Sequence, residues 1–134
     1  MVQRKQDKAD MTDTASNTKE SMQKIVNIFT TGDLSEVASL FSSTYIDHQR
    51  PPWLTIDGPE EFKHIVLGAR KALPNLRVTI EDCIAEGNAI AARLHWYSTQ
   101  PGGKKIERET IDMLRFAQGK VIEHWGAETW RKEG

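Results

Sequence analysis

The sequence predicts a single α+β domain in which three N-terminal helices pack on a strongly curved, mostly antiparallel sheet. Apolar residues recur with the helical period of about 3.6 in the first half of the chain, and with the strand period of 2 from Leu76 onward. Short turns separate the segments of period 2, so the strands they join are expected to be antiparallel neighbours. Helices followed by strands are typical of α+β folds, in which the helices cover one face of the sheet.

The three helices are each marked by a start signal and one apolar stripe. The first begins near Asn17 and ends at Gly32, because glycine readily closes a helix. The second is capped by Asp33, and the third starts at Pro59 after an irregular break over 44–58. The three apolar stripes consist of Met22, Ile25, Val26 and Phe29, of Leu34, Val37, Ala38 and Phe41, and of Phe62, Ile65, Val66, Ala69 and Leu73.

Four strands are predicted in the second half of the chain. They occupy residues 76–84, 90–96, 106–116 and 121–130. The sequences "AEGN", "QPGGK" and "AQGK" form the turns between them, which predicts an antiparallel meander. On the second strand the apolar set that ends in Trp96 is expected to face the core, which leaves Arg93 and His95 on the outer face.

Composition favours a soluble, cytoplasmic domain. The 134 residues suffice for one core, and the formal net charge of −1 comes with scattered basic residues, so neither nucleic acid nor an anionic membrane is expected as a partner. No apolar run is long enough to span a bilayer, and no signal peptide is evident. The single Cys83 suits a reducing compartment. Residues 1–16 are polar without periodicity, which predicts a flexible tail before a domain over 17–134.

Three sequence motifs carry a family resemblance. They are "YIDHQRP" (45–51), "LPNLRVTIEDCIAEGNAIAARLHW" (73–96) and "IDMLRFAQGKVIEHWG" (111–126). In this order they resemble the SnoaL-like polyketide cyclase family of the nuclear-transport-factor-2-like superfamily. The resemblance implies a cone-shaped α+β barrel with a deep apolar pocket, and a homodimer formed through the outer sheet face. Many members act on polyketide-like or steroid-like carbonyl compounds, others isomerise, dehydrate or hydrolyse, and some only bind.

Asp112 is the first candidate catalytic residue. Strand alternation places it on the same face as Thr110 and opposite Arg115, and the family pattern implies that this face points into the pocket. A carboxylate among apolar neighbours loses hydration and becomes a better proton acceptor. Such a base suits removal of a proton beside a ketone or ester carbonyl, after which the enolate closes a ring as in an aldol reaction. The alternative is a structural Asp112 that a neighbouring arginine or tyrosine hydroxyl satisfies.

His124 is the second candidate catalytic residue. Alternation places it on one face of the last strand with Gly126 and Glu128, although a one-residue bulge would reverse part of this assignment. It could protonate the new alkoxide or set the ionisation of Asp112, whereas the alternative is a histidine packed beside Trp125. The resemblance implies a catalytic acid two residues after His124, where this chain has Gly126. Either Asp112 or Glu128 takes that role, or the aldol chemistry is lost.

The loop after the second helix supplies further candidate contacts to a substrate. His48 matches the family's Y-x-x-H-x-x-P stretch, and we expect it at the pocket mouth with Tyr45, whose hydroxyl could polarise a carbonyl. Trp53 is expected to act as a lid. The alternatives are a rigid surface turn for "HQRPPW" and an apolar plug for Trp53. The remaining expected substrate contacts are Trp96, Thr110 and Glu128.

Two functions are compatible with these residues. The first is a cofactor-independent acid/base enzyme of the cyclase, isomerase, lyase or dehydratase type, with Asp112 and His124 acting on a small hydrophobic carbonyl compound. The second is a non-catalytic module that binds a small molecule or forms a dimer. No metal is expected, because the histidines lack the short spacing of a ligand pair, and no nucleotide fingerprint indicates a cofactor. Glu81 and Asp82 disfavour a reactive thiolate at Cys83.

Overall fold

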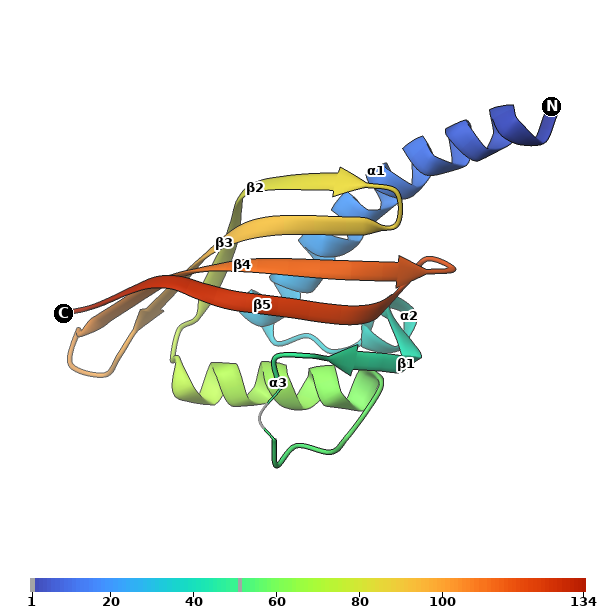
Figure 1. Ribbon diagram of the computed structural model, residues 1–134. Coiled ribbons are helices and arrows are strands. Elements are labelled where there is room, and N and C mark those ends of the chain that lie inside the picture. The colour runs from blue at the N-terminus through green and yellow to red at the C-terminus, as the bar shows by residue number, and fades with distance from the viewer. Residues whose placement is uncertain (1, 51) are drawn as a thin grey trace.

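The computed structural model places two helices, α1 (Val2–Thr31) and α3 (Pro59–Ala72), against one face of a five-stranded sheet (Figure 1). The backbone of residues 2–50 and 52–134 and the side chains of 17–50 and 52–134 are described. The predicted α+β class is therefore confirmed. The predicted start of the first helix near Asn17 is wrong, because α1 begins at Val2. The flexibility predicted for the tail over 1–16 stays a prediction, because the side chains of these residues are not described. The strands are β1 (Phe41–Asp47), β2 (Arg77–Glu86), β3 (Ala89–Thr99), β4 (Lys105–Ala117) and β5 (Lys120–Glu133).

Both long helices bury the apolar stripes that the sequence predicts. The buried positions include Met22, Ile25, Val26 and Phe29 on α1, and Phe62 and Val66 on α3. Gly32 ends α1 at a φ of 75°, with its N–H donated to the carbonyl of Ile28 at 2.7 Å. Pro59 stands in the first turn of α3, as predicted. An edge-to-face contact between Phe29 and Phe62, with centroids 5.5 Å apart, joins the two helices.

The segment between the two long helices differs from the prediction. The predicted helix from Asp33 to Phe41 is wrong, because only the single turn α2 (Val37–Leu40) is helical and Phe41 already begins β1. β1 also enters the predicted irregular break over 44–58. The sequence "STYI" within β1 is rich in β-branched and aromatic residues, which pack well on a sheet surface. Of the apolar residues that suggested a helical stripe, Val37 and Phe41 are buried, the first from the short helical turn and the second from the strand, whereas Ala38 is exposed.

The sheet has the order β1-β5-β4-β3-β2. β2 to β5 form the predicted antiparallel meander, whereas β1 pairs with β5 in parallel. The register of β2 against β3 shifts between Ile80 and Asp82, and β2 bends sharply along its length (Figure 1). β1 and β2 remain the two edges, so the curved sheet is not closed into a barrel.

The pairing of β5 with β4 has two register shifts, between Glu109 and Thr110 and between Arg115 and Phe116, and the second of these changes the predicted alternation near the start of β5. Phe116 pairs with Val121 but Arg115 pairs with Glu123, so Ile122 is an extra residue on β5. Val121 is therefore fully buried, not on the outer face as strict alternation predicts. Beyond the shift the predicted alternation resumes, which places His124 on the inner face.

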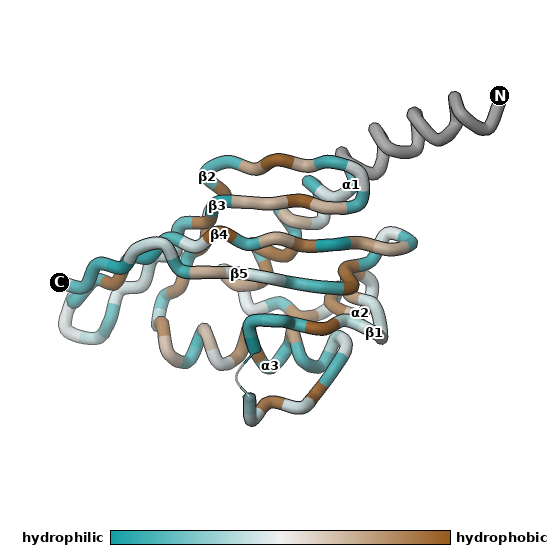
Figure 2. The backbone as a smooth tube through the Cα atoms, viewed as in Figure 1, coloured by the Kyte–Doolittle hydropathy of each residue, from teal (hydrophilic) through white to brown (hydrophobic). Residues whose placement is uncertain are grey.

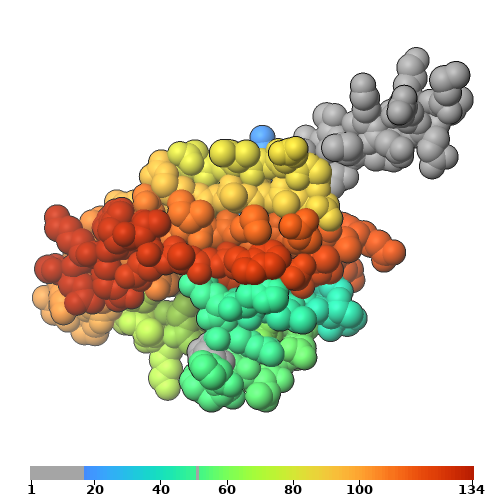
Figure 3. Space-filling model, viewed as in Figure 1, coloured from blue at the N-terminus to red at the C-terminus, as the bar shows by residue number. Residues whose placement is uncertain are grey.

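The core lies between the inner face of the sheet and the helices. Alternating brown and teal segments along β2 to β4 in Figure 2 show the two-faced pattern that the sequence predicts. On β3 the inner set is buried and ends at Trp96, whereas Arg93 pairs with Asp82 and Glu109 on the outer face. Figure 3 shows β2 to β5 side by side on this outer face. No helix in the described part of the chain is long and apolar enough to cross a membrane.

Candidate functional site

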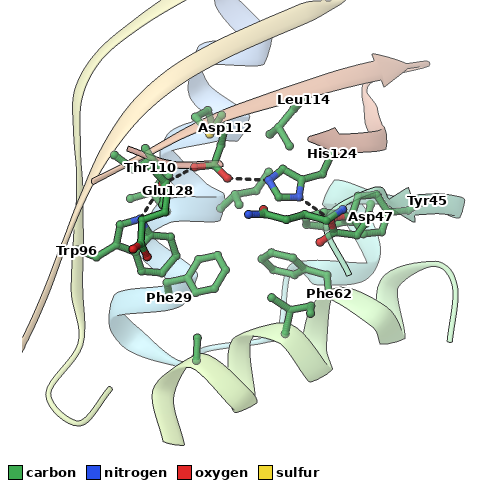
Figure 4. A pocket seen from close by; sticks show the side chains of 18 of the residues that line it. Phe29, Tyr45, Asp47, Phe62, Trp96, Thr110, Asp112, Leu114, His124 and Glu128 are labelled. Carbon is green, nitrogen blue, oxygen red and sulfur yellow. Dashed lines mark hydrogen bonds and ion pairs between the residues drawn. The ribbon is translucent and has the colours of Figure 1, made fainter. Parts of the chain in front are cut away.

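A cavity of about 290 Å³ lies between the inner face of the sheet and the helices α1 and α3 (Figure 4). This volume is at the lower end of the ~300–1,000 Å³ typical of small-molecule sites. The apolar part of its wall consists of Met22, Ile25, Val26, Phe29, Phe41, Phe62, Ile65, Ala69, Leu94, Trp96 and Leu114. The polar part consists of Tyr45, Asp47, Gln49, Arg108, Thr110, Asp112, His124 and Glu128.

Five side chains of this wall form one continuous series of hydrogen bonds, which we name the polar chain (Figure 4): Asp47, His124, Asp112, Thr110 and Trp96. The ring of His124 lies between two carboxylates, with Nδ1 2.8 Å from Asp47 Oδ1 and Nε2 2.7 Å from Asp112 Oδ1. Thr110 donates its hydroxyl to the other oxygen of Asp112 at 2.5 Å. Trp96 Nε1 donates to the Thr110 hydroxyl at 2.8 Å. The polar chain therefore runs along the cavity wall without a break.

The geometry of the polar chain fixes the charge of His124. Burial alone would lower the pKa of this imidazole, but the hydrogen bonds and negative charges of Asp112 and Asp47 raise it to about 9. Burial likewise acts to raise the pKa of Asp47, but its bonds to His124 and to the Gln49 N–H bring it below the ordinary value. At neutral pH the site therefore contains an imidazolium that donates from both nitrogens to carboxylates.

Tyr45 lies next to this charged group and is almost completely buried. Burial, followed by the charges of Asp47 and Glu61, raises the pKa of the Tyr45 hydroxyl above its ordinary range. The hydroxyl therefore remains protonated at any physiological pH, and it hydrogen-bonds to Asp47.

The fully buried Glu61 holds β1 in the position that the polar chain requires. It projects from the first turn of α3, and its Oε1 accepts the backbone N–H of Asp47 at 2.8 Å. Its Oε2 pairs with Arg50 Nη1 at 2.7 Å, which compensates the buried charge. One carboxylate thus joins α3, the end of β1 and the loop that follows.

Gly126 faces the meeting point of Asp112 and His124, because Gly126 is the direct partner of Asp112 across β4 and β5. A Cβ at this position would lie 2.6 Å from Asp112 Oδ1, 2.5 Å from Gln49 Oε1 and 3.1 Å from His124 Nε2. Real Cβ atoms essentially never come within 3.0 Å of another heavy atom. The first two distances therefore leave no room for a side chain unless a neighbour moves, and the third is tight. The place where the family resemblance implies an acid is therefore filled by the carboxylate of Asp112 and the amide of Gln49.

Arg108 stands at the opposite end of the cavity wall from Asp47. Its guanidinium lies over the ring of Trp96, its direct cross-strand partner, 4.4 Å from the ring centroid. Its nearest carboxylate oxygen belongs to Glu128, at 3.5 Å. Burial, the largest influence, lowers the pKa of Arg108 from its ordinary value, although an arginine remains charged in a protein.

The structure brings together six of the eight residues singled out from the sequence. Asp112, His124, Tyr45, Trp96, Thr110 and Glu128 all line the cavity. His48 lies elsewhere: it stacks on Trp125 with centroids 4.6 Å apart and bonds to Glu123 at 2.9 Å. Trp53 is 78% exposed and does not line the cavity.

Sequence reasoning did not single out Asp47, Gln49, Glu61 or Arg108. Asp47 sits inside the "YIDHQRP" motif, two residues after Tyr45, and would have followed from a strand there, because i and i+2 share a face. Arg108 likewise shares parity with Thr110, but a charged residue near a strand end is ordinarily placed in solvent. No group of three histidine, cysteine or acidic side chains suited to a metal ion occurs among the described residues.

Comparison with known proteins relates this geometry to a family. The sequence profile of the SnoaL-like polyketide cyclases matches residues 19–128. A candidate polyketide cyclase from Bacillus cereus, of known structure, is 28% identical with a TM-score of 0.72, over 81% of this chain and 72% of that one. No curated protein matches the chain at a significant level.

Two further solved structures share the fold at lower identity. TsrD from Streptomyces laurentii has a TM-score of 0.75 at 18% identity, over 85% of this chain and 89% of that one. AclR from Streptomyces galilaeus, a candidate hydroxylase, has a TM-score of 0.71 at 22% identity, over 85% and 79% of the two chains. The profile match spans most of the residues that build the sheet, the helices and the polar chain. This chain therefore belongs to the SnoaL-like polyketide cyclase family.

Proposed function

We propose that this protein is a cofactor-independent acid/base enzyme that acts on a small hydrophobic carbonyl compound. The observation that carries the proposal is the His124 imidazolium, which bridges Asp47 and Asp112 at the wall of an apolar cavity. Charged groups with a strongly raised or lowered pKa, gathered in a cavity, are typical of catalytic sites. Membership of the SnoaL-like polyketide cyclase family supports the same class of reaction.

The reaction that suits this arrangement is removal of a proton from the carbon next to a carbonyl group. The Asp112 carboxylate accepts the proton, and the electron pair of the C–H bond moves to form an enolate. Tyr45 and His124 are the nearby donors that can stabilise the negative oxygen. The enolate then attacks a second carbonyl to close a ring, takes up a proton at another carbon, or expels a leaving group. These outcomes correspond to a cyclase, an isomerase and a dehydratase.

His124 must exchange a partner in order to act as an acid. In the free protein both of its N–H groups are taken, one by each carboxylate. A substrate oxygen that displaces Asp112 from Nε2 gains a donor, and at the same time frees an oxygen of Asp112 to act as the base. The two roles are therefore coupled through a single hydrogen bond.

A binding module without catalysis is the second candidate function, and two observations favour it. Each polar group between Asp47 and Trp96 already has a partner within the polar chain, as in a structural network. The position that the family resemblance assigns to an acid is Gly126. In this case the cavity would hold a hydrophobic metabolite without changing it.

Proton exchange on the substrate separates the two candidates. Cyclic ketones and polyketide-like aromatic ketones are first screened by thermal shift, and those that bind are incubated with the protein in D₂O. Wild type should exchange the proton next to the carbonyl for deuterium, as read by NMR, and Asp112→Asn should bind the same ketone and exchange it at least about 100-fold more slowly. Asp82→Asn, on the outer face, is the matched control and should behave as wild type. Binding without exchange in wild type would establish the binding module instead.

A further inference from the structure

The guanidinium of Arg108 is the charged group on the cavity wall whose hydrogen-bonding capacity is least used. An arginine carries five N–H donors. Within the described part of the chain, Arg108 Nε is buried and has no hydrogen-bond partner. The one carboxylate near it, on Glu128, is 3.5 Å away, well beyond the ~2.7–2.9 Å of a charge-assisted hydrogen bond.

Glu128 is loosely paired with Arg108 because it is engaged by another arginine. Arg131 donates from Nε to one oxygen of Glu128 at 3.2 Å and from Nη2 to the other at 3.0 Å. This two-point pairing turns the carboxylate toward Arg131, at the rim of the cavity. Arg131 also pairs with Glu133 at 3.5 Å, and Glu128 is divided between two arginines, which leaves the buried Nε of Arg108 without a hydrogen-bond partner.

The opposite end of the cavity is rich in carboxylates. Asp47 and Asp112 together carry two negative charges around the single positive charge of His124. Between the two ends the wall contains apolar residues such as Trp96 and Phe29, in edge-to-face contact at 5.0 Å, and the hydroxyl of Thr110 is already bonded to Trp96 and Asp112. A ligand that matches this cavity is hydrophobic in the middle and carries its negative charge at the end near Arg108.

We propose that Arg108 is the binding residue for a carboxylate, so that the ligand of this cavity is a small hydrophobic acid whose carboxylate contacts Arg108. A planar guanidinium can donate two parallel hydrogen bonds to a carboxylate, and it does so most strongly where water is excluded. The position of the reacting group rests on the proposed acid/base function: in an oxo acid, the carbonyl would lie near Asp112 and His124.

The spacing of the two ends constrains the acid. Arg108 and Asp112 are four residues apart on one face of β4, which separates their backbones by about 13 Å along the strand. The Arg108 side chain shortens this distance, since its guanidinium lies over Trp96, whose Nε1 bonds to Thr110. A ligand that reaches both ends must therefore carry its carboxylate and its carbonyl on different sides of an apolar spacer, not on adjacent carbons.

Matched pairs of acids and amides test the assignment. Isothermal titration at pH 7.5 is carried out with 2-naphthoate and 4-phenylbutyrate, each compared with its neutral primary carboxamide of nearly the same shape. Wild type should bind each acid at least about tenfold more tightly than its amide. Arg108→Gln should lose this preference to within about twofold while still binding the amides, and Arg108→Lys, which keeps the charge but not the planar fork, should retain part of it.

Two control variants give the experiment its specificity. Arg115→Gln removes an arginine from the outer face of the same strand and should leave the acid preference unchanged. Glu128→Gln removes the carboxylate that competes for Arg108 and should increase the affinity for acids several-fold, a gain that a purely structural role for Arg108 would not produce.

The proposal is overturned if none of the acids binds to wild type, if wild type binds acids and amides equally, or if Arg108→Gln keeps the preference. These failures are distinct from failure of the proposed function. Neutral ketones that still exchange their protons in wild type, with no acid preference, would leave the acid/base activity standing and remove the carboxylate site. An acid preference that depends on Arg108, without proton exchange on any ketone, would support the carboxylate site and remove the acid/base activity.

Discussion

His124 carries a positive charge in a place where burial alone would remove it. The side chain is 15% exposed, and the transfer of an imidazolium from water into such a site is unfavourable. Hydrogen bonds to Asp47 and Asp112 outweigh this cost of burial. Both carboxylates are poorly hydrated themselves, so their attraction to the imidazolium is stronger than it would be in water. The protonation of His124 and the folding of the chain are therefore linked.

This linkage predicts how the stability of the protein depends on pH. The pKa of His124 is raised from an ordinary 6.5 to about 9, so the stabilisation is fully present below pH 6.5 and is lost as pH rises toward 9. The loss amounts to about 3 kcal/mol between these limits. Urea unfolding of wild type at pH 6.5, 7.5 and 9 should show it. His124→Gln should remove most of this pH dependence, and a variant that keeps it would show that another group titrates.

Replacement of Gly126 should cause a steric conflict at the site itself. In Gly126→Ala the new Cβ would press on Asp112, which its bonds to His124 and Thr110 hold in place. The expected cost is about 1–3 kcal/mol of the free energy of unfolding, the usual penalty for overpacking, together with a lowered pKa of His124.

Gly68→Ala is the matched control for this substitution. Gly68 lies in α3, a Cβ there would meet nothing within 4 Å, and alanine stabilises a helix interior by about 1 kcal/mol relative to glycine. Urea unfolding should therefore show opposite signs for the two glycine-to-alanine changes. A stabilised Gly126→Ala would contradict the close approach of Asp112.

Some residues of the site could be predicted from the sequence, and others could not. Asp112 and His124 were accessible because strand parity and the family motif agree on the face they occupy. Asp47 was not, since it faces inward only if its segment is a strand. Arg108 was missed for a different reason: a charged side chain is expected in solvent, and only the stacking of its guanidinium on Trp96 makes an inward position favourable.

At the scale of elements, the first turn of α3 contains two adjacent glutamates with very different roles. Glu61 is fully buried and binds both the Asp47 N–H and Arg50, whereas Glu60 forms an exposed pair with Lys63 at 3.0 Å. Glu61→Gln should lower the free energy of unfolding by about 1.5–3 kcal/mol, the range for a hydrogen bond to a charged group. Glu60→Gln should change it by less than about 1 kcal/mol. Equal effects in urea unfolding would show that Glu61 does not anchor β1.

The elements themselves were predictable where their signals are local. α1, α3 and the three hairpins of the meander each have apolar periodicity and a turn or cap within a few residues. β1 lacks both signals, because a parallel strand pairs with a partner far along the chain and is not joined to it by a short turn. The apolar residues from Leu34 to Phe41 fit a helical period, but packing of Phe41 against Tyr45 and Phe62 as part of a strand prevails over that local preference.

At the scale of the whole molecule, the outer face of the sheet leaves large apolar side chains uncovered. Ile111 and Trp130 are each 41% exposed on this face. We expect a homodimer through it, and Ile111→Glu should shift sedimentation velocity profiles from dimer to monomer without unfolding the chain. Leu67→Glu, at an apolar position on α3 that is 55% exposed, is the control and should leave the dimer intact. A wild type that sediments as a monomer at all concentrations would contradict the expectation.

The polar chain also has a consequence for how the molecule opens. It crosses the sheet from the edge strand β1 through β5 and β4 to β3. An edge strand is ordinarily the first part of a sheet to fray. Here the charged imidazole of His124 on β5 helps to hold the edge strand β1 through Asp47. Hydrogen exchange of the β1 amides should therefore accelerate as His124 loses its proton near pH 9. A ligand that draws Asp112 away from His124 should change the exchange rates of the same β1 amides.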